Sequence, residues 1–437
     1  MRNRSRNIAI AFGIAAAAGL GSTALADTAI TSLTTGDIVV LRGGNATTPD
    51  TITTTNQVPL YLDEYTASGT YVGSMDVPST GPNALTLPGI GDFQHEGILS
   101  DSTNGQLLTF AGYQVAAGSA DAFAQTGSSQ YQPVIGSISI PGGASSLSTT
   151  TVVNSYNNGS ANPYIRGAVT EDGNEYWTFG KYPSSGATSG GGINYVTGSG
   201  ASATTTPVEG FVDARDLTIV NGQLFMGSGS SSVGTHGGYA VSSGLPTTNL
   251  GNSQTNNTLL TDYAGGQSAS ALALLNIPTT DSNAGTQYGA DVMYTIGDQG
   301  TAGIVKYYYD PTGSVGTTGG ATADTGAWVP ASTDLGLNLS DNVVNPTGLI
   351  AVPDPSNPSW VDLFVSGTNG IYEYTDTSGD PTTALPSSGG YADFTLIASP
   401  SSDEAFYGVA MVPEPASIGL LAMGGFGLLA RRRRRKA

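Results

Sequence analysis

A pattern of short apolar segments repeats along most of the chain and leaves few choices of fold. Between residues 27 and 411, runs of β-branched and aromatic residues are bounded by Gly, Asn, Asp, Ser and Pro, and helical periodicity is nearly absent. This arrangement is typical of short strands joined by turns. The chain is also rich in Gly, Ser, Thr and Asn, as low-complexity chains are, but the regular spacing of the apolar runs argues against disorder.

The repeated unit has three recognisable strands. The first is a small residue followed by an apolar strand, at residues 96–99, 166–169, 215–218, 269–272, 347–350 and 407–410. The second reads LLTFAG, YWTFGK, LFMGSG, VMYTIG and LFVSG, and the third reads GGINYV, GGYAV, GIVKYYY and GIYEY. Repeats of this kind indicate an architecture in which each unit buries its apolar faces against its neighbours.

The two ends of the repeat region complement each other. Residues 36–43 supply a second strand, and residues 58–75 supply a third strand and a further, fourth strand, but no first strand precedes them. An unmatched first strand, residues 407–412, lies at the far end of the chain. This split predicts an all-β β-propeller in which the C-terminal strand joins and completes the N-terminal blade. An elongated β-sandwich or β-solenoid adhesin is the alternative.

Six first strands predict six blades of about 64 residues each, longer than the ~40–50 usual for propeller repeats. We expect the additional length in loops, at 114–133 and 242–267. A seventh, degenerate blade would fit within residues 320–345. Closure of the ring removes most exposed strand edges, which suits a protein without cysteine.

The chain opens with the three parts of a secretory signal peptide. Three arginines within residues 2–6 precede an apolar run at 8–20, and a small-x-small cleavage site with Ala24 and Ala26 follows. We predict that residues 1–26 are removed by cleavage after Ala26.

The chain ends on an uncharged run of 15 residues, 416–430, followed by six consecutive cations. As a helix the run would reach about 22 Å, short of the ~30 Å hydrocarbon core of a bilayer. The cations could not be dehydrated against a protein core, but they suit the cytoplasmic boundary of a membrane. We therefore predict a short transmembrane helix with the body outside and the basic tail inside. The tail is Arg431, Arg432, Arg433, Arg434, Arg435 and Lys436.

A proline–glutamate–proline motif, Pro413, Glu414 and Pro415, stands directly before this apolar run. The motif, the short helix and the arginine cluster, at residues 413–437, together resemble the PEP-CTERM sorting signal of Gram-negative bacteria. The resemblance implies that an exosortase reads the motif and processes the chain after the secretion machinery has exported it. It also implies anchoring at the periplasmic face of the membrane during sorting. After processing, the resemblance implies that the protein lies at the cell surface or in the extracellular matrix of hosts that make exopolysaccharide. A plain C-terminal membrane anchor is the alternative.

The extracytoplasmic domain is thus predicted to span residues 27–412, and its charge excludes one class of partner. Five Lys and Arg stand against 32 Asp and Glu in this body, a net charge of −27. Nucleic acid is excluded, because almost nothing could neutralise its phosphates. The absence of cysteine and the presence of only two histidines exclude thiolate nucleophiles, Cys-ligated zinc and His-rich metal sites.

The starts of the first strands supply the candidate site. Innermost strands line the central channel of a propeller, so equivalent residues there would surround one channel mouth. These residues are Glu96, Arg166, Arg215, Thr347 and Tyr407. Arg166 and Arg215 could bind a carboxylate or a sugar acid, with Glu96 or its neighbour His95 transferring a proton. Alternatively, each arginine pairs with a nearby acid such as Asp213 or Asp216 and ties blades together.

Calcium is the one cofactor that the composition invites, because carboxylate and carbonyl oxygens abound. The chain has neither an EF-hand loop nor a G-G-x-G-x-D repeat, so we predict no cofactor and no metal site, with Ca²⁺ as the open candidate. A G-x-S-x-G elbow is absent too, and the glycine clusters lack the lysine of a phosphate-binding loop.

Two functions fit these observations. The first is a non-enzymatic surface or matrix protein, exported with exopolysaccharide, that binds glycan or another surface component. The second is a propeller enzyme that acts on extracellular polysaccharide, either a lyase or a glycosidase. The lack of a catalytic signature and the sorting signal favour the first.

Overall fold

A computed structural model of the 437-residue chain describes most of the region between the two predicted signals. The described residues are 28–44, 52, 55–90, 95–122, 131–140, 144–156, 164–181, 191–210, 212–229, 236–251, 256–262, 268–278, 285–297, 303–312, 327–331, 337–338, 343–385 and 394–413. The predicted signal peptide, transmembrane helix and basic tail lie outside them.

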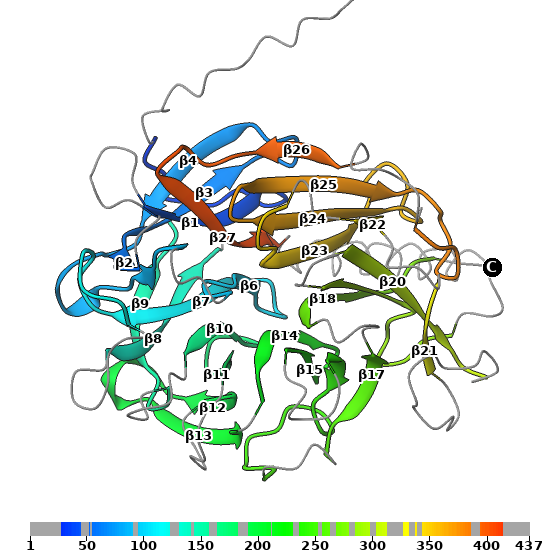
Figure 1. The fold of residues 1–437 in the computed structure, drawn as a ribbon, viewed down its shortest axis with the longest axis horizontal. Coiled ribbons are helices and arrows are strands. Elements are labelled where there is room, and N and C mark those ends of the chain that lie inside the picture. Colours follow the sequence, from blue (N-terminus) through cyan, green and yellow to red (C-terminus); the bar gives the residue numbers. More distant parts are fainter. Residues whose placement is uncertain are drawn as a thin grey trace, which may run out of the picture.

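Six antiparallel sheets are arranged around a common centre as the blades of a propeller (Figure 1). From the centre outward, blade 1 has β27 (Glu404–Met411), β1 (Ile38–Gly44), β3 (Leu60–Tyr65) and β4 (Tyr71–Asp76). Blade 2 has β6 (Ser100–Asp101), β7 (Leu107–Gln114), β8 (Gln132–Ser139) and β9 (Leu147–Val152). Blade 3 has β10 (Ile165–Val169), β11 (Glu175–Gly180), β12 (Ile193–Thr197) and β13 (Thr204–Glu209).

The remaining blades follow in chain order. Blade 4 has β14 (Ala214–Val220), β15 (Gln223–Ser228), β16 (Gly237–Ala240) and β17 (Thr258–Asp262). Blade 5 has β18 (Ala269–Leu275), β19 (Val292–Gly297), β20 (Gly303–Asp310) and β21 (Ala327–Pro330), with β22 (Leu337–Asn338) also paired to β20. Blade 6 has β23 (Gly348–Pro353), β24 (Val361–Gly367), β25 (Gly370–Asp376) and β26 (Thr395–Ala398). Outside the blades, β2 (Gln57–Val58) pairs with β5 (Leu87–Pro88).

The six-bladed propeller predicted from the repeat is confirmed. The room left for a seventh blade, residues 320–345, contains β21 and β22 where it is described, and both pair with β20 of blade 5. Residues 242–267, expected as a loop, contain β17, the outer strand of blade 4. The other expected long loop is found between the end of β7 at Gln114 and the start of β8 at Gln132.

The C-terminal strand closes the ring, as predicted. β27 pairs antiparallel with β1, with Val409 opposite Val40. It begins at Glu404, earlier than the predicted residue 407, and this added length contributes an ion pair. Arg42 of β1 places Nη1 2.5 Å from Oε1 of Glu404 and Nε 2.5 Å from Oδ2 of Asp63 on β3, so three strands of blade 1 are tied together.

The first strand of blade 2 differs from the prediction. The expected segment 96–99 is not a strand, and β6 covers Ser100–Asp101 instead. Left-handed backbone at His95 (φ 65°) and Gly97 (φ 74°) explains the difference, because it is incompatible with an extended ladder. The segment still contacts blade 3, where the N–H of Ile98 donates to the carbonyl of Arg166 at 3.1 Å.

The hydrophobic core consists of six clusters, one between each pair of neighbouring blades. Successive residues of a strand point to opposite faces, so one strand serves two clusters. Val39 of β1 packs toward blade 2 with Phe110, whereas Val40 packs toward blade 6 with Phe364. Because both faces of a blade are covered, its strands read as continuous apolar runs, which is why the repeat is visible in the sequence.

Candidate functional site

The residues predicted to surround one channel mouth lie close together, and most are buried. Arg166 and Arg215 are near the starts of β10 and β14, Thr347 stands just before β23, Glu96 precedes β6, and Tyr407 lies within β27. Glu96, Arg166, Thr347 and Tyr407 are at most 1% exposed, and Arg215 is partly exposed beside them. The charge of Glu96 influences the pKa values of Arg166, Arg215 and Tyr407, as expected for close neighbours. We call this group the ion-paired end of the channel, consisting of His95, Glu96, Arg166, Asp213, Arg215, Thr347 and Tyr407.

Asp213 is the acid that holds the two arginines. Nη1 of Arg166 donates to Oδ1 of Asp213 at 2.5 Å and to the carbonyl of Ala214 at 2.8 Å, while Nε of Arg215 lies 3.8 Å from Oδ2 of Asp213. Burial would raise the pKa of Asp213, but the charges of Arg166 and Arg215 outweigh it and hold that pKa below its usual value. Burial and the like charge of Arg166 lower the pKa of Arg215 to about 10. The pairing joins blade 3 to blade 4.

His95 is held in its neutral form. Burial lowers its pKa well below the usual value, and the positive charges of Arg215 and Arg166 lower it further. A neutral imidazole beside two arginines can accept a proton only at acidic pH. His95 is therefore a weak base in this setting.

Thr347 and Tyr407 serve as links between blades. The hydroxyl of Thr347, just before β23, donates to the backbone carbonyl of Tyr407 on β27. The phenol of Tyr407 donates to the carbonyl of Pro88 at 2.6 Å. Burial raises the pKa of this phenol well above its usual value, so it remains a hydrogen-bond donor at neutral pH.

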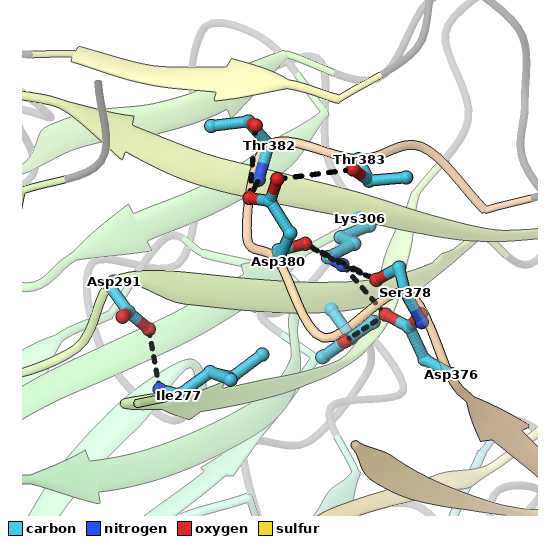
Figure 2. Close-up of polar contacts among 9 residues, drawn as sticks. Ile277, Asp291, Lys306, Asp376, Ser378, Asp380, Thr382 and Thr383 are labelled. Carbon is cyan, nitrogen blue, oxygen red and sulfur yellow. Dashed lines mark hydrogen bonds and ion pairs between the residues drawn. The ribbon is translucent and has the colours of Figure 1, made fainter. Parts of the chain in front are cut away.

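The remaining cations of the body also contact neighbours inside the fold. Lys306 of β20 reaches the turn after β25, where its Nζ lies 2.7 Å from Oδ2 of Asp376 and 2.9 Å from Oγ of Ser378 (Figure 2). It also donates to the carbonyl of Asp380 at 2.7 Å, which ties blade 5 to blade 6. Nζ of Lys181 lies 5.3 Å from the ring centre of Tyr164.

The opposite end of the channel is open. A cavity of about 930 Å³ is lined by all six innermost strands, from Ile98 and Thr347 to the strand ends at Asp101, Pro353 and Met411. Lining residues near the strand ends, including Asp101 and Pro353, are exposed to solvent. We call this the open end of the channel.

The described lining of the open end includes five acids, of which the sequence reasoning named only Asp216, as a possible partner of an arginine. They are Asp101, Asp216, Asp354, Asp362 and Glu373. Asp216 accepts the N–H of Leu272 at 2.8 Å, so it ties blade 4 to blade 5 through the backbone and does not pair with an arginine. Burial raises the pKa of Asp216 to about 7. The signal that could have located Asp101 and Asp354 is their place directly at the ends of innermost strands.

Within the described part of the chain, no group of three or more His, Asp or Glu side chains has the geometry to hold a metal ion. The same part contains no helix long and apolar enough to cross a membrane.

The fold and the channel define the class: a six-bladed β-propeller with an ion-paired end and an open end. Residues 412–435 match the PEP-CTERM protein-sorting motif. The motif implies an exported protein that exosortase recognises and sorts to the cell envelope. Pro413 is the last described residue, so Glu414, Pro415 and the arginine tail lie outside the described residues.

Two solved structures match the chain at low identity and low TM-score. A putative oxidoreductase (glucose dehydrogenase) from Thermus thermophilus is 12% identical, with a TM-score of 0.40 over 75% of this chain and 91% of that one. A putative 6-phosphogluconolactonase from Bacteroides uniformis is 10% identical, with a TM-score of 0.35 over 86% of this chain and 99% of that one. No curated protein matches the chain.

Proposed function

We propose that this protein is a non-enzymatic binding or structural module of the cell surface or extracellular matrix, associated with exopolysaccharide. In this proposal it is anchored in the membrane by its C-terminal segment until exosortase processes it at Pro413, Glu414 and Pro415. The sorting motif supports the export step. The fate of the cations in the propeller supports the non-enzymatic role.

One observation carries the proposal: Arg166, the buried cation of the predicted site, is engaged in holding two blades together. Arg166 is 1% exposed and is bound to Asp213 and to a backbone carbonyl. A substrate carboxylate would have to displace Asp213, and the freed Asp213 would then be a buried charge without compensation. His95, with its lowered pKa, is a poor proton carrier at neutral pH.

The test uses the exported protein and exopolysaccharide from the organism that makes it. We expect the purified protein to sediment with the polysaccharide and to leave its chain length unchanged. Mass spectrometry of the exported protein should show that the arginine tail has been removed, and replacing Glu414 by Gln should leave that tail in place. Protein that stays in the supernatant at every polysaccharide concentration contradicts the proposed association.

The enzyme alternative rests on the convergence of Glu96, Arg166 and Arg215 at one end of the channel. A lyase or glycosidase would shorten the polysaccharide, which is measured as a fall in viscosity and a rise in reducing ends. Arg215→Gln is the informative variant, because Arg215 is the partly exposed member of the cluster. Shortening by the wild type that this variant abolishes would establish the enzyme in place of the module.

A further inference from the structure

The cavity at the open end is walled mainly by aliphatic side chains. The lining includes Leu217, Leu272, Ile350 and Val409, and Phe364 is the aromatic residue among its described members. Its volume of about 930 Å³ lies within the ~300–1,000 Å³ of small-molecule sites. The wall therefore offers apolar area for an aliphatic chain and little for stacking a sugar ring.

Two acids of the cavity share one face of blade 6. In the pairing of β24 with β25, Asp362 stands opposite Thr375 and Phe364 stands opposite Glu373. Alternate residues of a strand point the same way, so these four side chains lie on one side of the blade. Phe364 packs against blade 1, so this face looks into the groove between blades 6 and 1. The cavity thus extends from the channel into that groove.

The carboxyl groups of this groove repel one another. Burial raises the pKa of Glu373, and the negative charges of Asp362 and Asp354 raise it further. Burial likewise raises the pKa of Asp362, with an added contribution from Asp354. At the channel side, Asp101 lines the mouth and is exposed to solvent. A cation placed among these groups would relieve the repulsion.

The cavity has no positive group to balance these acids among its described lining residues, which include neither Lys, Arg nor His. A concave surface of one charge sign concentrates ligands of the opposite sign and repels those of its own. Sugar acids and phosphates are therefore disfavoured. Aliphatic walls and a carboxylate rim together fit a ligand that is both apolar along its length and positively charged at its ends.

We infer that the open end binds a small organic cation of the aliphatic diamine or polyamine class. The ammonium groups lie at the carboxylates of Asp362 and Glu373 and at Asp101, and the methylene chain lies along the aliphatic wall. This site is independent of the proposed association with exopolysaccharide, since it uses the channel and leaves the outer faces of the blades free.

Calorimetric titration of the purified exported protein with spermidine, at about pH 8 and so well above the ordinary pKa values of Asp and Glu, tests the inference. We expect one spermidine per chain and no binding of hexanediol, which has a similar aliphatic body without charge. Glu373→Gln should weaken spermidine binding about tenfold, since one charge-assisted contact is lost. Asp362→Asn provides a second variant if the first fails to fold, as judged by circular dichroism.

The matched control is Asp76→Asn, because Asp76 is an exposed acid at the end of β4 that does not line the cavity. This variant should bind spermidine as the wild type does. Three results would overturn the inference: no binding of spermidine, equal weakening by Asp76→Asn and Glu373→Gln, or hexanediol binding as tightly as spermidine. Displacement of spermidine by an equal concentration of Ca²⁺ would also overturn it, in favour of a metal site.

Discussion

Asp213 and Asp216 lie three residues apart and are equally buried, at 7% exposed, yet their pKa values are shifted in opposite directions. Asp213 belongs to the ion-paired end, where Arg166 and Arg215 overcome the effect of burial and lower its pKa. Asp216 lines the cavity at the open end, where burial raises its pKa to about 7 despite hydrogen bonds from backbone N–H groups. The protonation of an acid in this propeller therefore depends on whether a cation has been placed beside it.

The body, residues 27–412, has only five Lys and Arg against 32 Asp and Glu. These few cations lie where blades meet or where the ring closes. Arg42 ties the closing strand through Glu404, Arg166 ties blade 3 to the start of blade 4, and Lys306 ties blade 5 to blade 6. The open end receives none among its described lining residues. The two ends of one channel thus differ in charge: acids face cations at the ion-paired end, whereas the described lining of the open end includes acids and no Lys or Arg.

The largest expected effect is at the ion-paired end. Arg166→Ala leaves Asp213 buried without its main partner, and removal of one member of a buried ion pair costs about 3–5 kcal/mol. Equilibrium unfolding in guanidinium chloride measures the loss. Lys181→Ala removes a less buried cation near the same Tyr164 ring and should change the free energy of unfolding by less than about 1 kcal/mol. Equal losses in the two variants would contradict the special role of Arg166.

Asp216 at the open end should contribute a large share of the pH dependence of stability. Because the folded pKa of Asp216 is raised, from 3.8 to about 7, its stabilising contribution is complete below the unfolded pKa and is lost as the pH rises through about 7. Asp216→Asn should remove roughly 2–4 kcal/mol of this fall in stability between pH 4 and pH 8. Melting temperatures across that range check it. Burial also raises the pKa of Glu209 to about 7, so Glu209 should retain part of the pH dependence in the Asp216→Asn variant. If the stability of that variant falls as steeply with pH as that of the wild type, the assignment to Asp216 is refuted.

The backbone conformation beside Glu96, at the ion-paired end, requires glycine at position 97. Gly97 has φ 74°, and a Cβ there would lie 2.7 Å from Cδ1 of Leu87 and 2.8 Å from Cβ of Tyr407. Gly97→Ala should cost about 1–3 kcal/mol, through backbone strain and the displacement of Tyr407. Gly222 has nearly the same φ, 73°, with no atom within 4 Å of such a Cβ, so Gly222→Ala isolates the strain and should cost less. A larger loss at Gly222 would show that close packing at Gly97 is unimportant.

The smallest effect is expected at the rim of the open end and has the opposite sign. Asp362→Asn removes a charge that faces Asp354 and Glu373 without a cation, so it should stabilise the protein by a few tenths to about 1 kcal/mol at neutral pH. The hydrogen bond from Thr375, 2.8 Å in the wild type, can be kept by the amide oxygen. Thermal unfolding measures the gain, with Asp76→Asn expected to be neutral. A destabilised Asp362→Asn variant would show that the groove is not repulsive.

The architecture could be predicted from the sequence because both faces of every blade are buried. Alternate residues such as Val39 and Val40 each enter a core cluster, so the strands appear as apolar runs at regular spacing. The placement of the closing strand followed from counting strands. The exception was residues 96–99, where left-handed backbone at His95 and Gly97 interrupts the strand. Gly97 packs against Tyr407, which is distant in the chain.

The site was only partly accessible from the sequence. Equivalent positions in the repeat grouped Glu96, Arg166 and Arg215, but only the three-dimensional arrangement shows that Arg166 is committed to Asp213. The acids of the open end were not accessible in this way. Asp362 and Glu373 share a face because of the register between β24 and β25, and register is set by packing and turn geometry, which residue type alone does not specify.

The central proposal is that the ion-paired end holds the ring together and takes no part in the proposed association with polysaccharide. The double variant Arg166→Met with Asp213→Leu tests it most directly, because replacing a buried ion pair by apolar residues of similar volume is often neutral or stabilising. The measurement is its sedimentation with exopolysaccharide, alongside its free energy of unfolding. We predict wild-type sedimentation and a smaller loss of stability than in Arg166→Ala, because the buried pair is removed together and only the partly exposed Arg215 loses its contact with Asp213. A folded double variant that no longer sediments with the polysaccharide would contradict the account and make these residues part of the binding site.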